Sequence, residues 1–301
     1  MNSSKSKHYF TNKLILGTAQ MGLDYGINNH EGKIRLNESL SILKFAYKNG
    51  IKNIDCAESY GNIHEIIGYF HKNNSKYRFH VHTKISRLNL KTEISSKVKE
   101  FTNQLNSNKV HSLMFHSYTT YLENKKNLKQ LIKLKEDGII NLIGVSVYSN
   151  KEIKCLLNDT EIDLIQIPFN ILDNSIEKRN LLEKAKINGK IIQARSVFLQ
   201  GLFFKDPNEN NIIVEKLRDE LKEIKKISSE NNMPIINLAL SYVLNQEYID
   251  NVLIGVDSLA QLKQNLKSVD KEISKNIILS IEKIKTKNKD FLNPITWLKY
   301  E

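Results

Sequence analysis

The sequence predicts an α/β protein, a single (β/α)₈ TIM barrel with extra C-terminal helices. Eight short apolar runs alternate with segments of helical periodicity, which is the pattern of parallel strands joined by helices. No linker rich in proline, glycine or serine divides the chain, and 301 residues fit one barrel with insertions. We therefore expect one domain over residues 1–301, in which residues 1–12 form a polar, flexible tail.

The expected strands are the apolar runs themselves. They cover residues 13–18, 52–56, 78–84, 110–115, 141–146, 163–167, 190–194 and 251–255. Between them, and after the last strand, helical spacing predicts helices that include residues 38–49, 63–70, 92–105, 122–136, 259–267 and 271–285. The first of these helices has Asn37 as its cap and Gly50 as its stop signal.

Three segments are expected to cover the mouth of the barrel. Residues 19–33 contain several glycines and follow the first strand. Residues 194–211 form a long connection, and loops of that length in compact domains tend to bind ligands or act as lids. The C-terminal tail carries Pro294 and Trp297 and is predicted to fold back over the same end.

Composition and charge exclude several classes of protein. No apolar run approaches the roughly 20 residues that cross a bilayer, so no membrane segment is expected. The formal charge is +12, but the lysines are scattered without a basic stripe or interleaved aromatics, which favours a solvated surface over nucleic-acid binding. Cys56 and Cys155 form no pair and no metal-binding pattern, and the polar N-terminus does not resemble a signal peptide. We expect a cytoplasmic protein without a metal site.

Four residues that can hold or move a proton fall near the ends of neighbouring strands. Asp55 and Tyr60 follow the second expected strand, Lys84 ends the third and His116 follows the fourth. Because the carboxyl ends of barrel strands converge on one mouth, these residues are predicted to share one site.

The four side chains make a plausible proton relay. A free tyrosine has a pKa of about 10 and is a poor proton donor, but an adjacent ammonium group lowers that pKa. Lys84 is expected to act in this way on Tyr60, with Asp55 keeping the lysine charged and oriented. A neutral His116 then holds the substrate oxygen, and the hydride must come from a cofactor, because no side chain donates one. Taken singly, each residue has an ordinary structural role; their joint occurrence favours catalysis.

These residues and their neighbours resemble the aldo-keto reductases over essentially the whole chain. The resemblance includes Gln166 and residues 17–20, 54–61, 83–84, 115–117, 144–146, 199–202 and 264–265. It implies that Tyr60 is the general acid/base, that Lys84 and Asp55 tune it, and that His116 positions the carbonyl of a small-molecule substrate. It also implies a nicotinamide cofactor bound extended across the mouth. Residues 20–33 resemble a subgroup found among surface-polysaccharide and unusual-sugar genes, which suggests a sugar-like substrate and carbohydrate biosynthesis. An anionic substrate is also compatible with the positive charge of Arg195.

The resemblance implies a set of cofactor contacts. They are Gly17, Thr18, Ser146, Gln166, Arg195, Ser196, Gly201, Asp257, Gln261, Gln264 and Asn265. Ser146 and Gln166 stand where family members bind the nicotinamide carboxamide, but the asparagine that usually follows the serine is Val147 here. Arg195 replaces the aromatic residue on which the nicotinamide ring generally stacks, and its planar guanidinium is also able to stack or to bind an anion.

The identity of the nucleotide is left open between two candidates. NADP(H) is the family expectation, and members that prefer it usually place Lys and Arg just after the eighth strand. This chain has Val256, Asp257 and Gln261 there, and an aspartate repels a 2′-phosphate but accepts hydrogen bonds from a free ribose hydroxyl. NAD(H) is therefore the alternative, unless Lys263 or Lys267 compensates.

Two other functions and four substrate contacts complete the predictions. Lys84 at a strand end is also compatible with a Schiff-base lyase, and the changes at Val147 and Arg195 with a non-catalytic, nucleotide-binding regulatory barrel. The residues expected to contact the substrate are Tyr25, Arg87, Tyr118 and Trp297. No oligomeric state is predicted.

Overall fold

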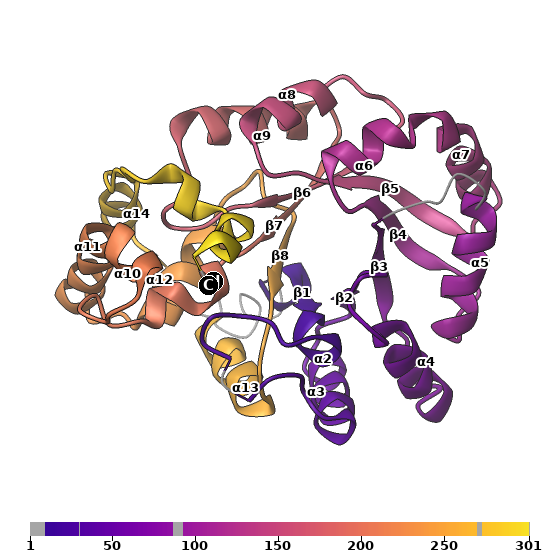
Figure 1. Cartoon of the computed structure of the whole chain (residues 1–301), viewed down its shortest axis with the longest axis horizontal. Coiled ribbons are helices and arrows are strands. Elements are labelled where there is room, and N and C mark those ends of the chain that lie inside the picture. The colour runs from indigo at the N-terminus through magenta and orange to yellow at the C-terminus, as the bar shows by residue number, and fades with distance from the viewer. Residues whose placement is uncertain (1–9, 30, 87–92, 270–272, 301) are drawn as a thin grey trace.

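The computed structural model describes residues 10–29, 31–86, 93–269 and 273–300, and it contains a closed barrel of parallel strands (Figure 1). Each strand pairs with the next along the chain, and β8 closes the barrel on β1. The strands are β1 (Leu14–Gly17), β2 (Asn53–Asp55), β3 (His80–Ile85), β4 (Val110–Phe115), β5 (Ile140–Ser146), β6 (Leu164–Pro168), β7 (Ile191–Arg195) and β8 (Asn251–Ile254). The predicted fold class is confirmed.

Helices surround the strands as an outer layer (Figure 1). They are α2 (Ala19–Gly22), α3 (Leu36–Lys48), α4 (Ile63–Asn73), α5 (Ile94–Gln104), α6 (Tyr118–Glu123), α7 (Leu128–Glu136), α8 (Asn150–Leu156), α9 (Ile176–Ile187), α10 (Ile212–Lys216), α11 (Arg218–Glu230), α12 (Ile235–Leu244), α13 (Leu259–Ser268) and α14 (Lys275–Glu282). Short 3₁₀ segments are η1 (Lys125–Asn127), η2 (Leu199–Phe204), η3 (Lys289–Leu292) and η4 (Pro294–Lys299). The core lies between the helices and the strands, where apolar side chains of both are buried.

Serine caps fix several helix starts next to the barrel ends. Ser149 accepts from the backbone N–H of Glu152, whose side chain in turn accepts from the Ser149 backbone, which is a capping box at the start of α8. Ser175 and Ser258 cap α9 and α13 in the simpler way. Each cap is worth about 1 kcal/mol, so these residues fix where each loop ends and its helix begins.

The prediction of one continuous helix over residues 122–136 is wrong. The chain instead forms α6, η1 and α7, because Asn124 leaves helical geometry and its side-chain amide donates to the Thr120 carbonyl. Asparagine competes for backbone hydrogen bonds in this way, which favours helix ends over helix interiors. The segment 19–33, predicted as a loop, begins with the single turn of α2.

The tail does return to the barrel mouth, but Trp297 faces away from it. Its indole is 1% exposed and its Nε1–H donates to the Phe291 carbonyl at 3.0 Å, so Trp297 anchors η4 on η3. Pro294 and Ile295, at the start of η4, line the cavity instead.

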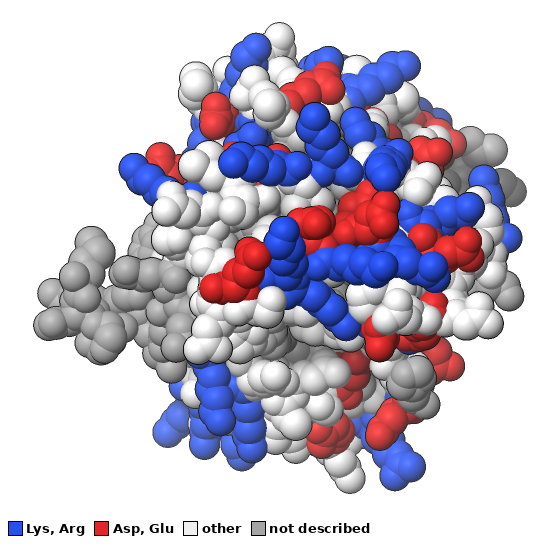
Figure 2. Space-filling view, turned by 90° about the vertical axis from the view of Figure 1, so that its left-hand side faces the viewer, with Lys and Arg blue, Asp and Glu red and all other residues white. Residues whose placement is uncertain are grey.

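The surface charge is mixed. On the face seen in Figure 2, Lys and Arg side chains are interspersed with Asp and Glu. Exposed pairs such as Lys287 with Asp219 and Lys154 with Glu177 account for part of this pattern. Within the described residues, no helix is both long and apolar enough to span a membrane.

Candidate active site

A cavity of about 850 Å³ opens at the carboxyl ends of the strands, and Asp55, Tyr60, Lys84 and His116 all line it. They come from the ends of β2, β3 and β4 and from the turn after β2. The structure therefore brings the four predicted catalytic side chains together, as the strand-end positions required.

A buried ion pair lies at the floor of the cavity. Lys84 and Asp55 are each 2% exposed, and the lysine Nζ donates to Asp55 Oδ1 and to the Cys56 carbonyl. Asp55 pairs with His82 in the parallel register, so Lys84 lies one side-chain repeat further along β3 on the same face of the sheet. Two opposite charges buried in this way stabilise each other, and removing either leaves the other unpaired.

The backbone at Tyr60 and Gly61 packs closely against the backbone at Gly22, and this contact sets the position of Tyr60. A Cβ added to Gly22 would clash with the Tyr60 carbonyl, and one added to Gly61 would lie 2.6 Å from the Gly22 oxygen. Gly61 also has a φ of +56°, which glycine adopts without strain. As a result the Tyr60 ring centroid lies 5.4 Å from the Lys84 Nζ and 5.9 Å from the centroid of the His116 ring.

The substitution Gly22→Ala tests this placement. The new methyl must push the Tyr60 backbone away, and a displacement near 1 Å at a catalytic group costs roughly 10²-fold in rate. For the carbonyl reduction that the sequence resemblance implies, we expect the turnover of an aldehyde to fall by about that factor, while the affinity for the nucleotide changes little. The control is Gly189→Ala, at a positive φ with no heavy atom within 4 Å of the new Cβ, which should lower stability without lowering turnover of the folded enzyme. Equal losses of turnover in both variants would contradict the assigned role of the Gly22 contact.

The pKa of Tyr60 moves in the direction opposite to the one expected from sequence. Burial, followed by the charge of Asp55, raises the pKa of the phenol well above its usual value. The charge of Arg195 acts in the opposite direction, but burial together with Asp55 outweighs it. The phenol therefore keeps its proton at neutral pH and is suited to donate it.

His116 is neutral in this site. Burial, and then the charges of Lys84 and Arg195, lower the pKa of its imidazole to about 3. Its Nδ1 lies 2.9 Å from Ser86 Oγ and 3.3 Å from Ser59 Oγ, so two hydroxyl groups hold the ring. A neutral imidazole always carries one N–H donor, which fits the role of positioning an oxygen atom.

A polar chain beneath the ion pair was missed by the sequence analysis. Gln166 Nε2 donates to Asp55 Oδ2 at 2.8 Å and to Gln193 Oε1 at 3.1 Å, and Gln193 Nε2 lies 3.2 Å from His82 Nδ1. Within the described part of the chain, the buried Gln166 Oε1 has no partner. The sequence did contain a signal for this chain of contacts. Residues two apart on a strand point to the same face of the sheet, so His82 is expected on the face of Lys84, and Gln193 on the face of Arg195.

Arg195, at the end of β7, lines the same cavity but is packed differently from the expectation. Its guanidinium carbon lies 4.2 Å from the centroid of the Tyr148 ring, an aromatic partner that the sequence analysis did not identify. Its Nη atoms donate to the Val147 carbonyl and to Ser196 Oγ, both at 3.3 Å.

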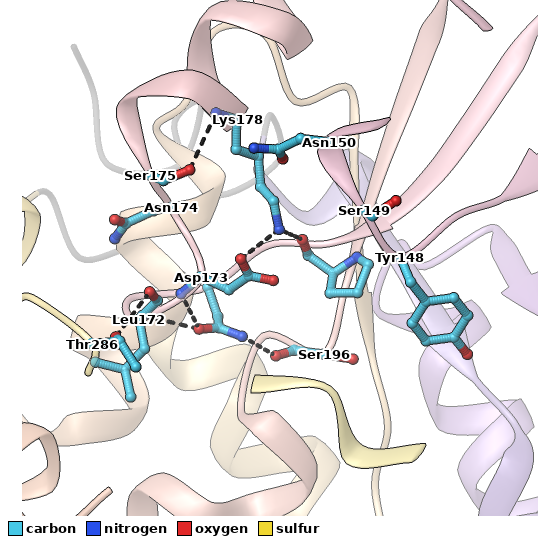
Figure 3. A network of polar contacts seen from close by, with 12 residues as sticks. Tyr148, Ser149, Asn150, Leu172, Asp173, Asn174, Ser175, Lys178, Ser196 and Thr286 are labelled. Carbon is cyan, nitrogen blue, oxygen red and sulfur yellow. Dashed lines mark hydrogen bonds and ion pairs between the residues drawn. The ribbon is translucent and has the colours of Figure 1, made fainter. Parts of the chain in front are cut away.

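A second network fixes the backbone beside Arg195 (Figure 3). Asn170 Nδ2 donates to the Ser196 carbonyl at 3.0 Å, while its Oδ1 accepts from the backbone N–H groups of Leu172 and Asp173. Lys178 reaches from α9 to Asp173 and to the Pro168 carbonyl, as Figure 3 shows. Because Ser196 has a φ of +59°, outside the usual range for serine, this network is what holds it there.

Two loops are tied together over the mouth. Asn28 Nδ2 donates to the Gly201 carbonyl at 2.5 Å, and Gln200 Nε2 donates to the Tyr25 hydroxyl at 3.2 Å. Gly201 has a φ of +88°, and a Cβ there would lie 2.6 Å from the Asn28 amide, so only glycine fits. Tyr25 lines the cavity as expected for a substrate contact.

The other expected substrate contacts differ. Tyr118 does not line the cavity, because it lies on α6 with the centroid of its ring 5.9 Å from that of Tyr121. Trp297 is buried in the tail, as described above, and does not line the cavity either. Arg87 lies outside the described residues.

The predicted cofactor contacts all line the cavity. At the end bounded by α13, Asp257 and Gln261 bond each other twice, from the Asp257 N–H to Gln261 Oε1 at 2.8 Å and from Gln261 Nε2 to Asp257 Oδ2 at 3.0 Å. Lys263 Nζ lies 5.6 Å from the centroid of the Phe45 ring, and neither Lys263 nor Lys267 is among the described residues that line the cavity.

Comparisons with known proteins show which sequences and folds this chain resembles. Residues 13–286 match the model of the aldo/keto reductase family. The D-threo-aldose 1-dehydrogenase of Pseudomonas sp is 23% identical over 302 residues, which cover 85% of this chain and 92% of that protein. The NADH-specific methylglyoxal reductase of Escherichia coli (strain K12) is 26% identical over 163 residues, 48% of each chain. The holo form of aldo-keto reductase AKR11C1 from Bacillus halodurans superposes with a TM-score of 0.74 at 22% identity, covering 90% of this chain and 91% of that one. None of these matches supports the surface-polysaccharide subgroup.

Proposed function

The chain belongs to the aldo/keto reductase family, and we propose that it is a nicotinamide-dependent reductase of aldehydes or ketones with Tyr60 as its general acid. The observation that carries the proposal is the grouping of Tyr60, His116 and the Lys84–Asp55 pair on the wall of one cavity. No other set of side chains in the described cavity combines a protonated phenol with a buried ion pair and a neutral imidazole.

Each residue has a distinct task in this proposal. Tyr60 donates its proton to the carbonyl oxygen as that oxygen gains negative charge, and His116 donates a hydrogen bond to the same atom. Lys84, held by Asp55, stabilises the phenolate that remains. A nicotinamide held in this cavity would supply the hydride.

The residues present fit a nicotinamide group. The unpartnered, buried Gln166 Oε1 is an acceptor suited to the N–H of a carboxamide, and the buried Ser146 lies at the adjoining strand end. Asp55 fixes this orientation, because a flipped Gln166 amide would turn its oxygen toward a carboxylate.

We propose NAD(H) rather than NADP(H) as the nucleotide. Asp257 places a carboxylate at the α13 end of the cavity, and Lys263 is turned to Phe45. A carboxylate repels a 2′-phosphate and accepts hydrogen bonds from a ribose diol.

This choice predicts a difference in affinity that fluorescence titration measures directly. NADH should bind at least about 5-fold more tightly than NADPH, since a like-charge contact near 4 Å costs roughly 1–4 kcal/mol. The variant Asp257→Ser should bind NADPH more tightly and so reduce the difference in affinity between the two nucleotides. The control is Asp219→Ser, which changes an exposed aspartate of α11 and should leave that difference unchanged. Equal affinities in the unmodified protein would contradict the choice.

The reductase itself is tested by supplying NADH with 4-nitrobenzaldehyde or glyceraldehyde and following nucleotide oxidation. A sugar-like carbonyl compound is the proposed natural substrate, in keeping with the aldose named for one relative.

The lyase alternative is disfavoured because a Schiff base needs a neutral amine, and Lys84 forms an ion pair with Asp55. No product from either aldehyde, with the nucleotide bound, would favour the non-catalytic alternative.

A further inference from the structure

Arg195 is a cation of the cavity wall without a carboxylate partner among the described residues. The charged residues lining the cavity are Asp24, Asp55, Lys84, Arg195 and Asp257. Lys84 and Asp55 form an ion pair with each other, whereas the hydrogen bonds of the Arg195 guanidinium among the described residues go to the neutral Val147 carbonyl and Ser196 hydroxyl. A guanidinium has five N–H donors, so two such bonds leave three for a ligand or for water.

The guanidinium is held in place before any ligand arrives. The Tyr148 ring covers one face of it, and the Asn170 network fixes the neighbouring Ser196. A rigid planar fork binds carboxylate and phosphate oxygens in pairs and loses little entropy in doing so.

The charge of Arg195 acts at the catalytic end of the cavity. Burial is the main cause of the altered pKa values of Tyr25, Tyr60 and His116, and the Arg195 charge is a further cause in each case. The Tyr25 oxygen accepts from Gln200, so its own O–H is left to donate. An anion at this position would meet a guanidinium and a phenol close to the residues that serve the carbonyl.

We propose that Arg195 and Tyr25 form an anion-binding subsite for the substrate, so that the preferred substrates are carbonyl compounds bearing a carboxylate or phosphate group. This inference rests on the proposed reductase function and narrows its substrate class. Among the described lining residues, the α13 end of the cavity, where Asp257 and Gln264 lie, has no cation comparable to Arg195. Arg195 lies instead at the catalytic end, so we assign the anion that it binds to the substrate.

The test compares pairs of substrates in which one member carries an anionic group and the other is neutral. With NADH, the pairs are glyceraldehyde with glyceraldehyde 3-phosphate and 4-nitrobenzaldehyde with 4-carboxybenzaldehyde. In the unmodified enzyme the anionic member of each pair should have a kcat/KM at least about 10-fold higher, because it forms charged hydrogen bonds with the guanidinium that the neutral member lacks. In Arg195→Met this preference should disappear, mainly through a higher KM for the anionic member. The control Lys133→Met removes the same charge from the exposed surface of α7 and should keep the preference.

A binding experiment separates this inference from the proposed function. Calorimetric titration with glycerol 3-phosphate and with glycerol requires no turnover. The unmodified protein should bind only the phosphate ester measurably, and Arg195→Met should lose that binding.

If both ligands behave alike, or if the substrate preference survives Arg195→Met, the subsite is refuted. If Arg195→Met instead weakens NADH binding more than 10-fold and leaves the preference intact, the arginine serves the nucleotide pyrophosphate and the proposal is wrong. Failure of every aldehyde with normal glycerol 3-phosphate binding would reject the reductase and retain the anion site.

Discussion

Replacing Tyr60 by phenylalanine is expected to lower the rate of hydride transfer by about 10³-fold and to leave the affinity for NADH nearly unchanged. The phenol is the half-buried, protonated group beside His116 on the cavity wall, and it is the proposed donor of the proton to the carbonyl oxygen. The ring itself is retained in phenylalanine, so the packing against Gly22 and Gly61 persists. Single-turnover loss of NADH absorbance measures the rate, and fluorescence titration measures the affinity.

The matched control removes a tyrosine hydroxyl that lies far from the cavity. Tyr69 is 52% exposed on α4, and Tyr69→Phe should leave both quantities unchanged. A Tyr60→Phe enzyme that still transfers hydride at the normal rate would mean that another group is the acid.

Replacing Lys84 by methionine should have the second large effect, on stability as well as on rate. It leaves the Asp55 carboxylate buried with only Gln166 and without a counter-charge, which typically costs about 3–5 kcal/mol in the free energy of unfolding. Hydride transfer should fall by a factor similar to that of Tyr60→Phe, because the phenolate formed in the reaction loses its stabilising ammonium. Urea unfolding gives the first quantity and single-turnover kinetics the second.

The double variant Asp55→Asn with Lys84→Met separates these two effects. Asparagine removes the charge but keeps an oxygen that accepts from Gln166, so the double variant should regain roughly 2 kcal/mol of the stability lost in the single variant. Its activity should stay low, since the ammonium is still missing. An active double variant would show that the ion pair serves folding alone.

The ends of the strands were predictable from the sequence because apolar runs alternate regularly with segments of helical periodicity along the chain. Eight apolar runs locate the strands to within a few residues, and residues at strand ends must meet at one mouth. Asp55, Lys84 and His116 could therefore be grouped without any structure. Tyr60 could be grouped with them because it follows β2 so closely.

The parts that failed depend on loop conformation and on electrostatic balance. Tyr118 and Trp297 are aromatic residues near the mouth in sequence, yet local packing against Tyr121 and Phe291 turns them away from the cavity. The direction of the Tyr60 pKa shift depends on how deeply the phenol is buried and on how close the Asp55 charge lies, and neither can be read from the spacing of residues in the sequence. Gln193 was missed because a glutamine on a strand looks structural until its partner, Gln166, is known.

The central claim is that a nucleotide hydride reaches a carbonyl carbon in this cavity while Tyr60 protonates the oxygen. The most direct measurement supplies NADH dideuterated at C4 of the nicotinamide together with 4-carboxybenzaldehyde and determines the mass of the alcohol formed. The account predicts one deuterium on the carbinol carbon with the unmodified enzyme and almost no alcohol with Tyr60→Phe. Alcohol without deuterium, or labelled alcohol formed equally fast by Tyr60→Phe, would contradict it.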